Sequence, residues 1–166
     1  MKMKITVKKI TNERLMRAAC GFTTAAESRM SLEKIYQCEH SPLRTQLFWV
    51  EMVDIPTFVS VHLVRHKIGV EHYVKSNRTD RASHTGDLGR MQPVNHAMLI
   101  NAQALINMAR KRLCKKASPE TQEVMAAIKR KITAVDPALA ARLVPDCVYR
   151  GRCHELKPCR QPDQSP

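Results

Sequence analysis

The segment from Arg65 to Arg78 carries the side chains best suited to chemistry. It reads Arg-His-Lys-Ile-Gly-Val-Glu-His-Tyr-Val-Lys-Ser-Asn-Arg and follows an apolar run at 57–64. An arginine can hold a phosphate through two parallel hydrogen bonds, a histidine can donate to a ring or phosphate oxygen, and a serine adds a neutral donor. These residue types predict a pocket for an anionic nucleotide. The alternative is a solvated basic loop, which is what most charge runs are.

The chain as a whole is strongly basic. It has 166 residues, with 28 Lys and Arg against 15 Asp and Glu, so the formal net charge is +13. Such an excess of charge indicates an anionic partner, and nucleic acid, nucleotides and anionic cofactors are all candidates. Aromatic residues make up only 4% of the chain, and no nucleic-acid-binding motif is visible. We therefore expect small anions as ligands, and a nucleic-acid-binding protein remains the alternative.

Composition excludes several other classes. Hydrophobic residues make up 43% of the chain, which argues against global disorder. No apolar run approaches the ~18 residues of a transmembrane helix. The start of the chain is charged throughout and lacks the apolar region of a signal peptide. We therefore expect no membrane partner and a cytoplasmic location.

The cysteines and histidines do not predict a metal site. The last three of the six cysteines are spaced C-x5-C-x5-C, which is not the close pairing of a zinc ribbon. In a cytoplasmic chain we expect reduced thiols. Four histidines have no acid or cysteine at ligand spacing and are expected on the surface or in the core: His72, His84, His96 and His154.

Hydrophobic spacing predicts the elements of the N-terminal part. Apolar and polar residues alternate over 3–10, which predicts a half-exposed strand. Asn12 is expected to cap a helix through about Cys20. A second helix is expected to begin at Ser31 and to stop before the His-Ser-Pro sequence at 40–42, because proline disfavours a helical predecessor.

The middle of the chain holds the basic segment between apolar elements. Residues 46–53 are apolar and aromatic and predict a strand. The apolar run 57–64 fits either a helix or a buried strand. A polar connection with little to bury is expected over 65–90. Apolar residues then recur at intervals of three and four, which predicts one helix over 94–116.

The C-terminal part begins with a clear helix signal. Ser118 followed by proline and glutamate predicts a helix that ends near Asp136, and a short helix is expected over 138–143. Residues 161–166 are expected to be a disordered tail. The fold class predicted for the chain is α+β, with an antiparallel sheet packed against helices in one domain.

Three segments, in order along the chain, resemble flavin-dependent thymidylate synthases (the ThyX family). The signature of that family reads Arg-His-Arg, seven residues, then Ser, often continued by Gly-Arg. Upstream it commonly has His-x-Ser/Thr-Pro-Phe-Glu-His, a strand and Pro-x-Phe-Val. Here Glu-His-Ser-Pro-Leu-Arg-Thr at 39–45, the strand at 46–53 and Ile-Pro-Thr-Phe-Val at 55–59 precede the basic segment.

The resemblance continues downstream. The family has a helix that reads roughly Asn-Ala-Arg, then Asn, then a nucleotide-binding Arg, then Ala-Gln-x-Glu-Ile. This chain has Asn-Ala-Gln at 101–103, then Asn107, Arg112 and Ala-Ser-Pro-Glu-Thr at 117–121. Residues 145–155 also resemble the Cys-Gly-Cys-x-Glu endings of some members.

The resemblance implies a ThyX-like flavin- and nucleotide-binding domain over residues 1–160. It implies a homotetramer with FAD and dUMP sites shared between subunits. In the implied reaction NADPH reduces FAD, the methylene carbon of methylenetetrahydrofolate passes to dUMP, and the flavin supplies the hydride that gives dTMP. No protein nucleophile is implied, because the protein holds the reactants while the cofactor does the chemistry.

Site residues follow from the resemblance by position. The expected FAD contacts are Ser41, Arg65, His66, Lys67, Asn101 and Asn107. The expected dUMP contacts are His62, Ser76, Arg78, Arg90 and Arg112. Arg65 is also expected near the nucleotide, where it and Ser76 would assist the reaction. Arg112 is further expected at a helix end, near a face shared with Asn101 and Asn107.

The sequence departs from the family pattern at several ligand contacts. Lys67 replaces the second Arg of the signature and lacks its planar fork. Eight residues, not seven, separate Lys67 from Ser76. Gln103 replaces an Arg, and His62 stands where a nucleotide-contacting Gln is usual. A ThyX-like enzyme that modifies another pyrimidine nucleotide, or one that has lost activity, is therefore a further alternative.

Overall fold

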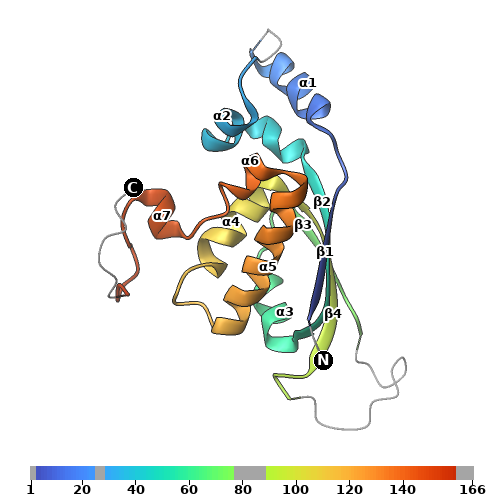
Figure 1. Cartoon of the computed structure of the whole chain (residues 1–166), viewed down its shortest axis with the longest axis vertical. Helices are drawn as coiled ribbons and strands as arrows, with labels where there is room; N and C mark the ends of the chain where they lie inside the picture. The colour runs from blue at the N-terminus through green and yellow to red at the C-terminus, as the bar shows by residue number, and fades with distance from the viewer. Residues whose placement is uncertain (1–2, 25–28, 77–88, 160–166) are drawn as a thin grey trace.

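The computed structural model describes residues 3–24, 29–76 and 89–159 (Figure 1). The expectations for Arg78, for His84 and for the tail at 161–166 lie outside these residues. In chain order the elements are β1 (Lys4–Lys9), α1 (Glu13–Thr24), α2 (Leu32–Gln37), the short 3-10 helix η1 (Ser41–Thr45), β2 (Leu47–Pro56), α3 (Thr57–Leu63), β3 (Val70–Val74), β4 (Pro93–Asn101), α4 (Ala102–Arg112), α5 (Pro119–Val135), α6 (Pro137–Ala140) and α7 (Asp146–Arg150).

Four strands form one sheet in the order β1-β2-β4-β3, and each neighbouring pair is antiparallel. Helices α3, α4 and α5 lie on one face of this sheet (Figure 1). Alternate residues of β4 point into that layer and are buried: Val94, His96, Met98 and Ile100. The predicted α+β architecture, an antiparallel sheet packed against helices, is confirmed.

The N-terminal predictions agree with the structure. The strand expected at 3–10 is β1, and α1 begins where Asn12 Oδ1 accepts a hydrogen bond from the Leu15 backbone N–H at 3.3 Å. Ser31 caps α2 by accepting from the Lys34 backbone N–H at 3.2 Å. Both caps act within a single helical turn, so sequence spacing alone finds them.

The apolar run at 57–64, which the sequence left open between helix and strand, forms α3. Pro56 ends β2 and stands at the N-cap position of this helix. The face of α3 formed by Phe58, Val59 and Leu63 is buried against the core. Helix α3 therefore delivers the Arg-His-Lys sequence at 65–67 to the end of a buried element.

The prediction of a single helix over 94–116 is wrong for residues 94–101. Residues 93–101 form strand β4, and only Ala102–Arg112 form the helix α4. β4 lies between β2 and β3, so its outward positions Ala97 and Leu99 are also partly covered. Because β4 has apolar residues on both of its faces, its apolar side chains recur at spacings of three and four as well as two. The spacings of three and four led to the prediction of a helix.

The connection expected over 65–90 also contains a strand that the sequence did not reveal. β3 pairs with β4 at the edge of the sheet, and only Val70 of its five residues is buried. An edge strand with one buried position carries almost no hydrophobic pattern. Gly69 turns the chain into it with φ +75°, a conformation that side-chain-bearing residues rarely adopt.

The C-terminal helices are tied to the N-terminal part by Asp136. This buried carboxylate accepts hydrogen bonds from Lys9 Nζ at 2.6 Å and from the Tyr36 hydroxyl at 2.8 Å. It also caps α6 by accepting from the Leu139 backbone N–H. Ser118 caps α5 as predicted, whereas the short helix expected over 138–143 is limited to 137–140, and α7 was not predicted.

None of the described helices is long and apolar enough to cross a lipid bilayer.

Candidate functional site

The end of α3 and the end of α4 meet at Arg112. The Arg112 guanidinium donates from Nη2 to the His62 carbonyl oxygen at 2.7 Å, and from Nε to His66 Nε2 at 3.0 Å. Arg112 is the last residue of α4, as predicted, and the two histidines lie in and just after α3. Three of the predicted ligand contacts are therefore brought together by hydrogen bonds that span 46 to 50 residues of sequence.

The bond from Arg112 fixes the protonation pattern of His66. An arginine can only donate, so His66 Nε2 must accept, and the proton of the neutral ring is on Nδ1. Burial, then the charge of Arg112, lowers the pKa of His66 to about 4. His66 is therefore neutral at pH 7, and its Nδ1–H is the donor left for a ligand.

His62 connects the same site to the start of α5. Its Nδ1 lies 3.0 Å from Thr121 Oγ1, which in turn lies 2.8 Å from the Ser118 hydroxyl. Burial lowers the pKa of His62, and the charges of Arg112, Arg65 and Arg90 lower it further. A neutral imidazole surrounded by arginines is a feature of an anion-binding site, because the arginines already supply the positive charge.

The arginines of this site have no acidic partner in the part of the chain that the structure describes. Among the described residues, no ion pair involves Arg65, Lys67, Arg90 or Arg112. Arg90 lies over the ring of Phe58 at 4.4 Å from its centre, and the same ring meets His62 edge-on. Burial and the neighbouring charge of Arg65 lower the pKa of Arg112. An anionic ligand would stabilise these like charges, which no described carboxylate neutralises.

Asn101 has a structural role at the junction of β4 and α4. Its Oδ1 caps α4 by accepting from the Ala104 backbone N–H at 2.9 Å, and its own backbone N–H donates to the Gly69 carbonyl at 2.9 Å. A Cβ at Gly69 would overlap the Asn101 side-chain amide. The side-chain oxygen of Asn101 is therefore already used within the protein.

Asn107 belongs to a second polar cluster, on another side of α4. Its Oδ1 accepts from Arg110 Nη1 at 3.3 Å, and Arg110 forms an ion pair with Glu39. Glu39 also accepts from Gln103 Nε2 at 2.5 Å. Arg112 is five positions after Asn107 and so lies roughly 140° further around the helix axis. The expected face shared by Arg112 and Asn107 is therefore wrong. The structure thus divides the predicted contacts into two groups, one around Arg112 and one around Asn107 of α4.

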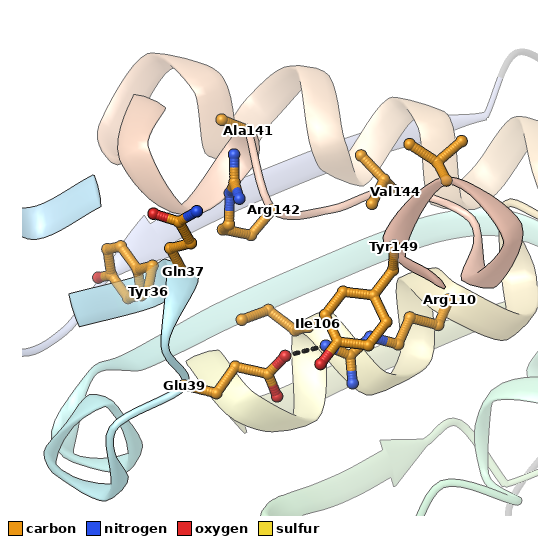
Figure 2. Close-up of a pocket in the computed structure, with 10 residues that line it drawn as sticks. Tyr36, Gln37, Glu39, Ile106, Arg110, Ala141, Arg142, Val144 and Tyr149 are labelled. Carbon is orange, nitrogen blue, oxygen red and sulfur yellow. Dashed lines mark hydrogen bonds and ion pairs between the residues drawn. The ribbon is translucent and has the colours of Figure 1, made fainter. Parts of the chain in front are cut away.

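A pocket of about 240 Å³ lies beside this second cluster (Figure 2). Tyr149 of α7 covers the Arg110 guanidinium, which lies 3.5 Å from the centre of its ring, and the Glu39–Arg110 pair lies below (Figure 2). Ser41, the first residue of η1, is exposed two residues after Glu39. Sequence reasoning missed Glu39 as a contact of α4, although the spacing of Gln103, Asn107 and Arg110 puts the three on one helix face.

Of the remaining predicted residues, Arg65 and Arg90 lie close enough to His62 for their charges to lower its pKa. Arg65 and Lys67 are exposed immediately after α3, and Arg90 is exposed shortly before β4. Ser76 is partly buried and ends the described stretch that contains β3. Within the described residues, no group of three or more His, Cys, Asp or Glu side chains could hold a metal ion.

Comparison with known proteins identifies structural relatives only. No protein-family model and no curated protein sequence matches the chain. A crystal structure of Thymidylate Synthase X (ThyX) from Helicobacter pylori with FAD and dUMP has a TM-score of 0.68 and 18% sequence identity over 89% of this chain and 99% of that one. A second structure of flavin-dependent thymidylate synthase ThyX from Helicobacter pylori, complexed with FAD and dUMP, has a TM-score of 0.70 and 16% identity over 85% and 99%. At these identities the likeness establishes the fold, and this chain has a ThyX-like fold.

Proposed function

We propose that this protein is a flavin-dependent thymidylate synthase-like enzyme that reductively methylates dUMP to dTMP. One observation carries the proposal. Arg65, Arg90 and Arg112 surround a neutral histidine without an acidic partner among the described residues, on a fold shared with proteins whose structures contain FAD and dUMP. The motif order of the sequence supports the same conclusion.

The nucleotide half of the proposed site centres on Arg112. A guanidinium at a helix end, fixed by two internal hydrogen bonds, is prepared to meet a phosphate without losing side-chain freedom on binding. Arg90, and in the sequence also Ser76 and Arg78, would add donors around the same anion. Because the His62 ring is neutral, the arginines supply the positive charge that would attract the phosphate.

The flavin half of the proposed site fits an anionic, acceptor-rich cofactor. Arg65 and Lys67 offer cations, and His66 offers an Nδ1–H donor that Arg112 holds in one tautomer. On the other side of α4, Asn107 is exposed beside Arg110, whose buried Nε has no hydrogen-bond partner among the described residues. Such a donor set suits the diphosphate and ring carbonyls of FAD. When bound, FAD supplies the hydride that completes the methyl group.

The protein side of the reaction is binding and orientation. NADPH would provide the reducing equivalents and methylenetetrahydrofolate the one-carbon unit, so no side chain has to form a covalent bond with the pyrimidine. The task left to these residues is to hold anionic reactants in register, with Arg65 and Ser76 closest to the reacting groups.

We further propose assembly as a homotetramer. In the described part of the chain, no helix covers the sheet face opposite α3, α4 and α5 (Figure 1). That face carries the ring pair of Trp49 and Tyr73, with centres 5.5 Å apart, beside Leu99. A group of uncovered aromatic and aliphatic side chains on a sheet face favours contact with another subunit. Light scattering coupled to gel filtration measures the mass; a monomer at micromolar concentration would contradict this part of the proposal.

The decisive experiment combines a spectrum and an assay. Purified protein with added FAD should show bound-flavin absorbance after gel filtration. With dUMP tritiated at carbon 5, methylenetetrahydrofolate and NADPH, it should release tritium and form dTMP. A protein that retains no FAD would contradict the proposal. FAD binding without tritium release would support the proposed ligand binding and contradict the proposed reaction.

His62, at a position where the resemblance leads us to expect a glutamine, favours one alternative: a ThyX-like enzyme acting on another pyrimidine nucleotide. The same assay with dCMP and with substituted deoxyuridylates separates the two. The basic nucleic-acid-binding protein is the other alternative. Tight, steeply salt-dependent DNA binding without any flavin uptake would favour it.

A further inference from the structure

A chain of hydrogen bonds runs from the interior of the protein to the Arg-His-Lys turn. Ser60 Oγ lies 3.0 Å from His96 Nδ1, and His96 Nε2 lies 2.9 Å from His72 Nδ1. His72 Nε2 lies 2.8 Å from the His66 carbonyl oxygen. Ser60 is on α3, His96 on β4 and His72 on β3, so three elements contribute to one line of contacts.

The register of the sheet explains why these side chains meet. His72 pairs with Met98, and Val74 pairs with His96, so His72 and His96 are diagonal neighbours on the same face of the sheet. This is the face that α3 covers, and Ser60 and His96 are both buried there. The imidazole rings of His72 and His96 lie 5.1 Å apart between centres.

The His66 carbonyl oxygen, at the end of this chain of hydrogen bonds, determines which atom donates in each bond. A carbonyl oxygen only accepts, so His72 Nε2 must carry a proton and donate to it. When the His72 ring is neutral, its Nδ1 accepts, and His96 Nε2 must donate to it. Burial, with a smaller contribution from His72, lowers the pKa of His96 to about 4, so this ring is neutral and its Nδ1 accepts from the Ser60 hydroxyl. With a neutral His72, this is the one arrangement that gives each of the three hydrogen bonds a donor and an acceptor.

We infer that His72 is a positioning residue for the Arg65–Lys67 turn, and that His96 and Ser60 hold it in the tautomer that does so. The carbonyl bonded by His72 belongs to His66, and the ring of the same residue accepts from Arg112 Nε. His66 is thus held from two sides, by β3 through its backbone and by α4 through its side chain. This role rests on the proposed function, because the turn is the part of the chain that would face the flavin and the nucleotide.

The test uses two substitutions at one position. His72→Phe keeps a ring of similar shape and removes both hydrogen bonds. His72→Gln keeps an amide N–H at about the position of Nε2 and so restores the donor to the His66 carbonyl. Tyr73→Phe is the control, because Tyr73 is the next residue of β3, points to the opposite face and keeps its ring.

Two readouts decide the result. Calorimetry should find dUMP binding about tenfold weaker in His72→Phe, as expected for one lost hydrogen bond, and substantially recovered in His72→Gln. Amide exchange at Val64 and His66, the last backbone donors to α3, should be about tenfold faster in His72→Phe and near normal in His72→Gln. Unchanged affinity and exchange in a folded His72→Phe protein, or no recovery in His72→Gln, would overturn the inference.

Nitrogen-15 NMR of the wild-type protein provides a readout independent of any ligand. It should show the proton of His72 and that of His96 on Nε2. A proton on Nδ1 of either ring would overturn the inference, even if His72→Phe failed to fold. If wild-type protein bound neither flavin nor dUMP, the proposed function would fail, while tautomers and amide exchange would still decide whether His72 holds the turn.

Discussion

Arg112 donates from Nε to His66 Nε2 over 3.0 Å, and the two residues are 46 positions apart in the sequence. Because Arg112 is the last residue of α4, the position of this helix end determines that His66 Nε2 accepts and that the ring proton is on Nδ1. The bond also joins the end of α3, from which the Arg-His-Lys turn emerges, to the helix that carries the other predicted ligand contacts.

Replacing Arg112 should weaken nucleotide binding. Arg112→Ala should lower the affinity for dUMP by about 10- to 100-fold, the range expected for a lost charge-assisted hydrogen bond. Arg112→Lys should give an intermediate affinity, because lysine keeps the charge and loses the planar fork. Calorimetry gives the dissociation constants, and circular dichroism checks that the variants are folded.

Arg130→Ala is the control for the loss of positive charge, since Arg130 is exposed on α5 and has no described partner. It should bind dUMP like the wild type. Equal affinities in Arg112→Ala and Arg130→Ala would remove Arg112 from the proposed site.

Acid should destabilise the protein before its carboxylates titrate. Burial lowers the pKa of His66 and of His96 from 6.5 to about 4 in the folded state. Between these values the unfolded chain binds more protons than the folded one, so the free energy of unfolding falls as the pH drops from about 6.5 towards 4 and is fully present above 6.5. Urea denaturation at a series of pH values measures this slope.

His66→Asn removes one of the two groups and should make the slope in that range shallower. Proton NMR titration of the His66 ring gives a direct check. A midpoint near 6.5 for this ring would contradict the assigned burial and the contact with Arg112.

Gly69→Ala should destabilise the protein through the entry into β3. The added Cβ would overlap the Asn101 amide, and the residue would have to keep φ at +75°. Together we expect a loss of about 1–3 kcal/mol in the free energy of unfolding. Gly89→Ala is the matched control, because a Cβ there meets no atom of the described residues within 4 Å and its φ is not in the left-handed region. Urea denaturation of both variants compares them; equal stabilities would contradict the close contact with Asn101.

Arg110→Ala should release the C-terminal segment from α4. The variant loses the ion pair with Glu39 and the contact with the Tyr149 ring, and it leaves a partly buried carboxylate at Glu39. We expect a loss of roughly 1–3 kcal/mol and faster amide exchange over Asp146–Arg150.

Arg150→Ala removes an arginine of α7 whose ion pair with Asp146 is exposed and lies within the helix. Such pairs contribute about 0.3–0.5 kcal/mol, so this control should change little. Equal exchange rates in α7 of Arg110→Ala and wild type would show that the Arg110–Tyr149 contact does not hold α7.

Local signals determined much of this protein from the sequence. Ser31 and Ser118 mark helix starts because a cap acts on backbone N–H groups within one turn. Strand β1 follows from alternation over a few residues, and most of β2 follows from its apolar and aromatic residues. The Arg-His-Lys sequence at the end of an apolar run already indicated an anion site, since the residue types and their place after a buried element are visible without a fold.

Only the tertiary structure decided the rest. Residues 94–101 became a strand because neighbours on both sides complete its hydrogen bonds, and β3 became a strand through pairing with β4 despite having a single buried residue. The neutrality of His66, its tautomer and the line from Ser60 to His72 depend on contacts between residues 24 to 46 positions apart. Charge and hydrogen-bond direction are set by what lies within a few ångströms in space, and sequence spacing does not encode that distance.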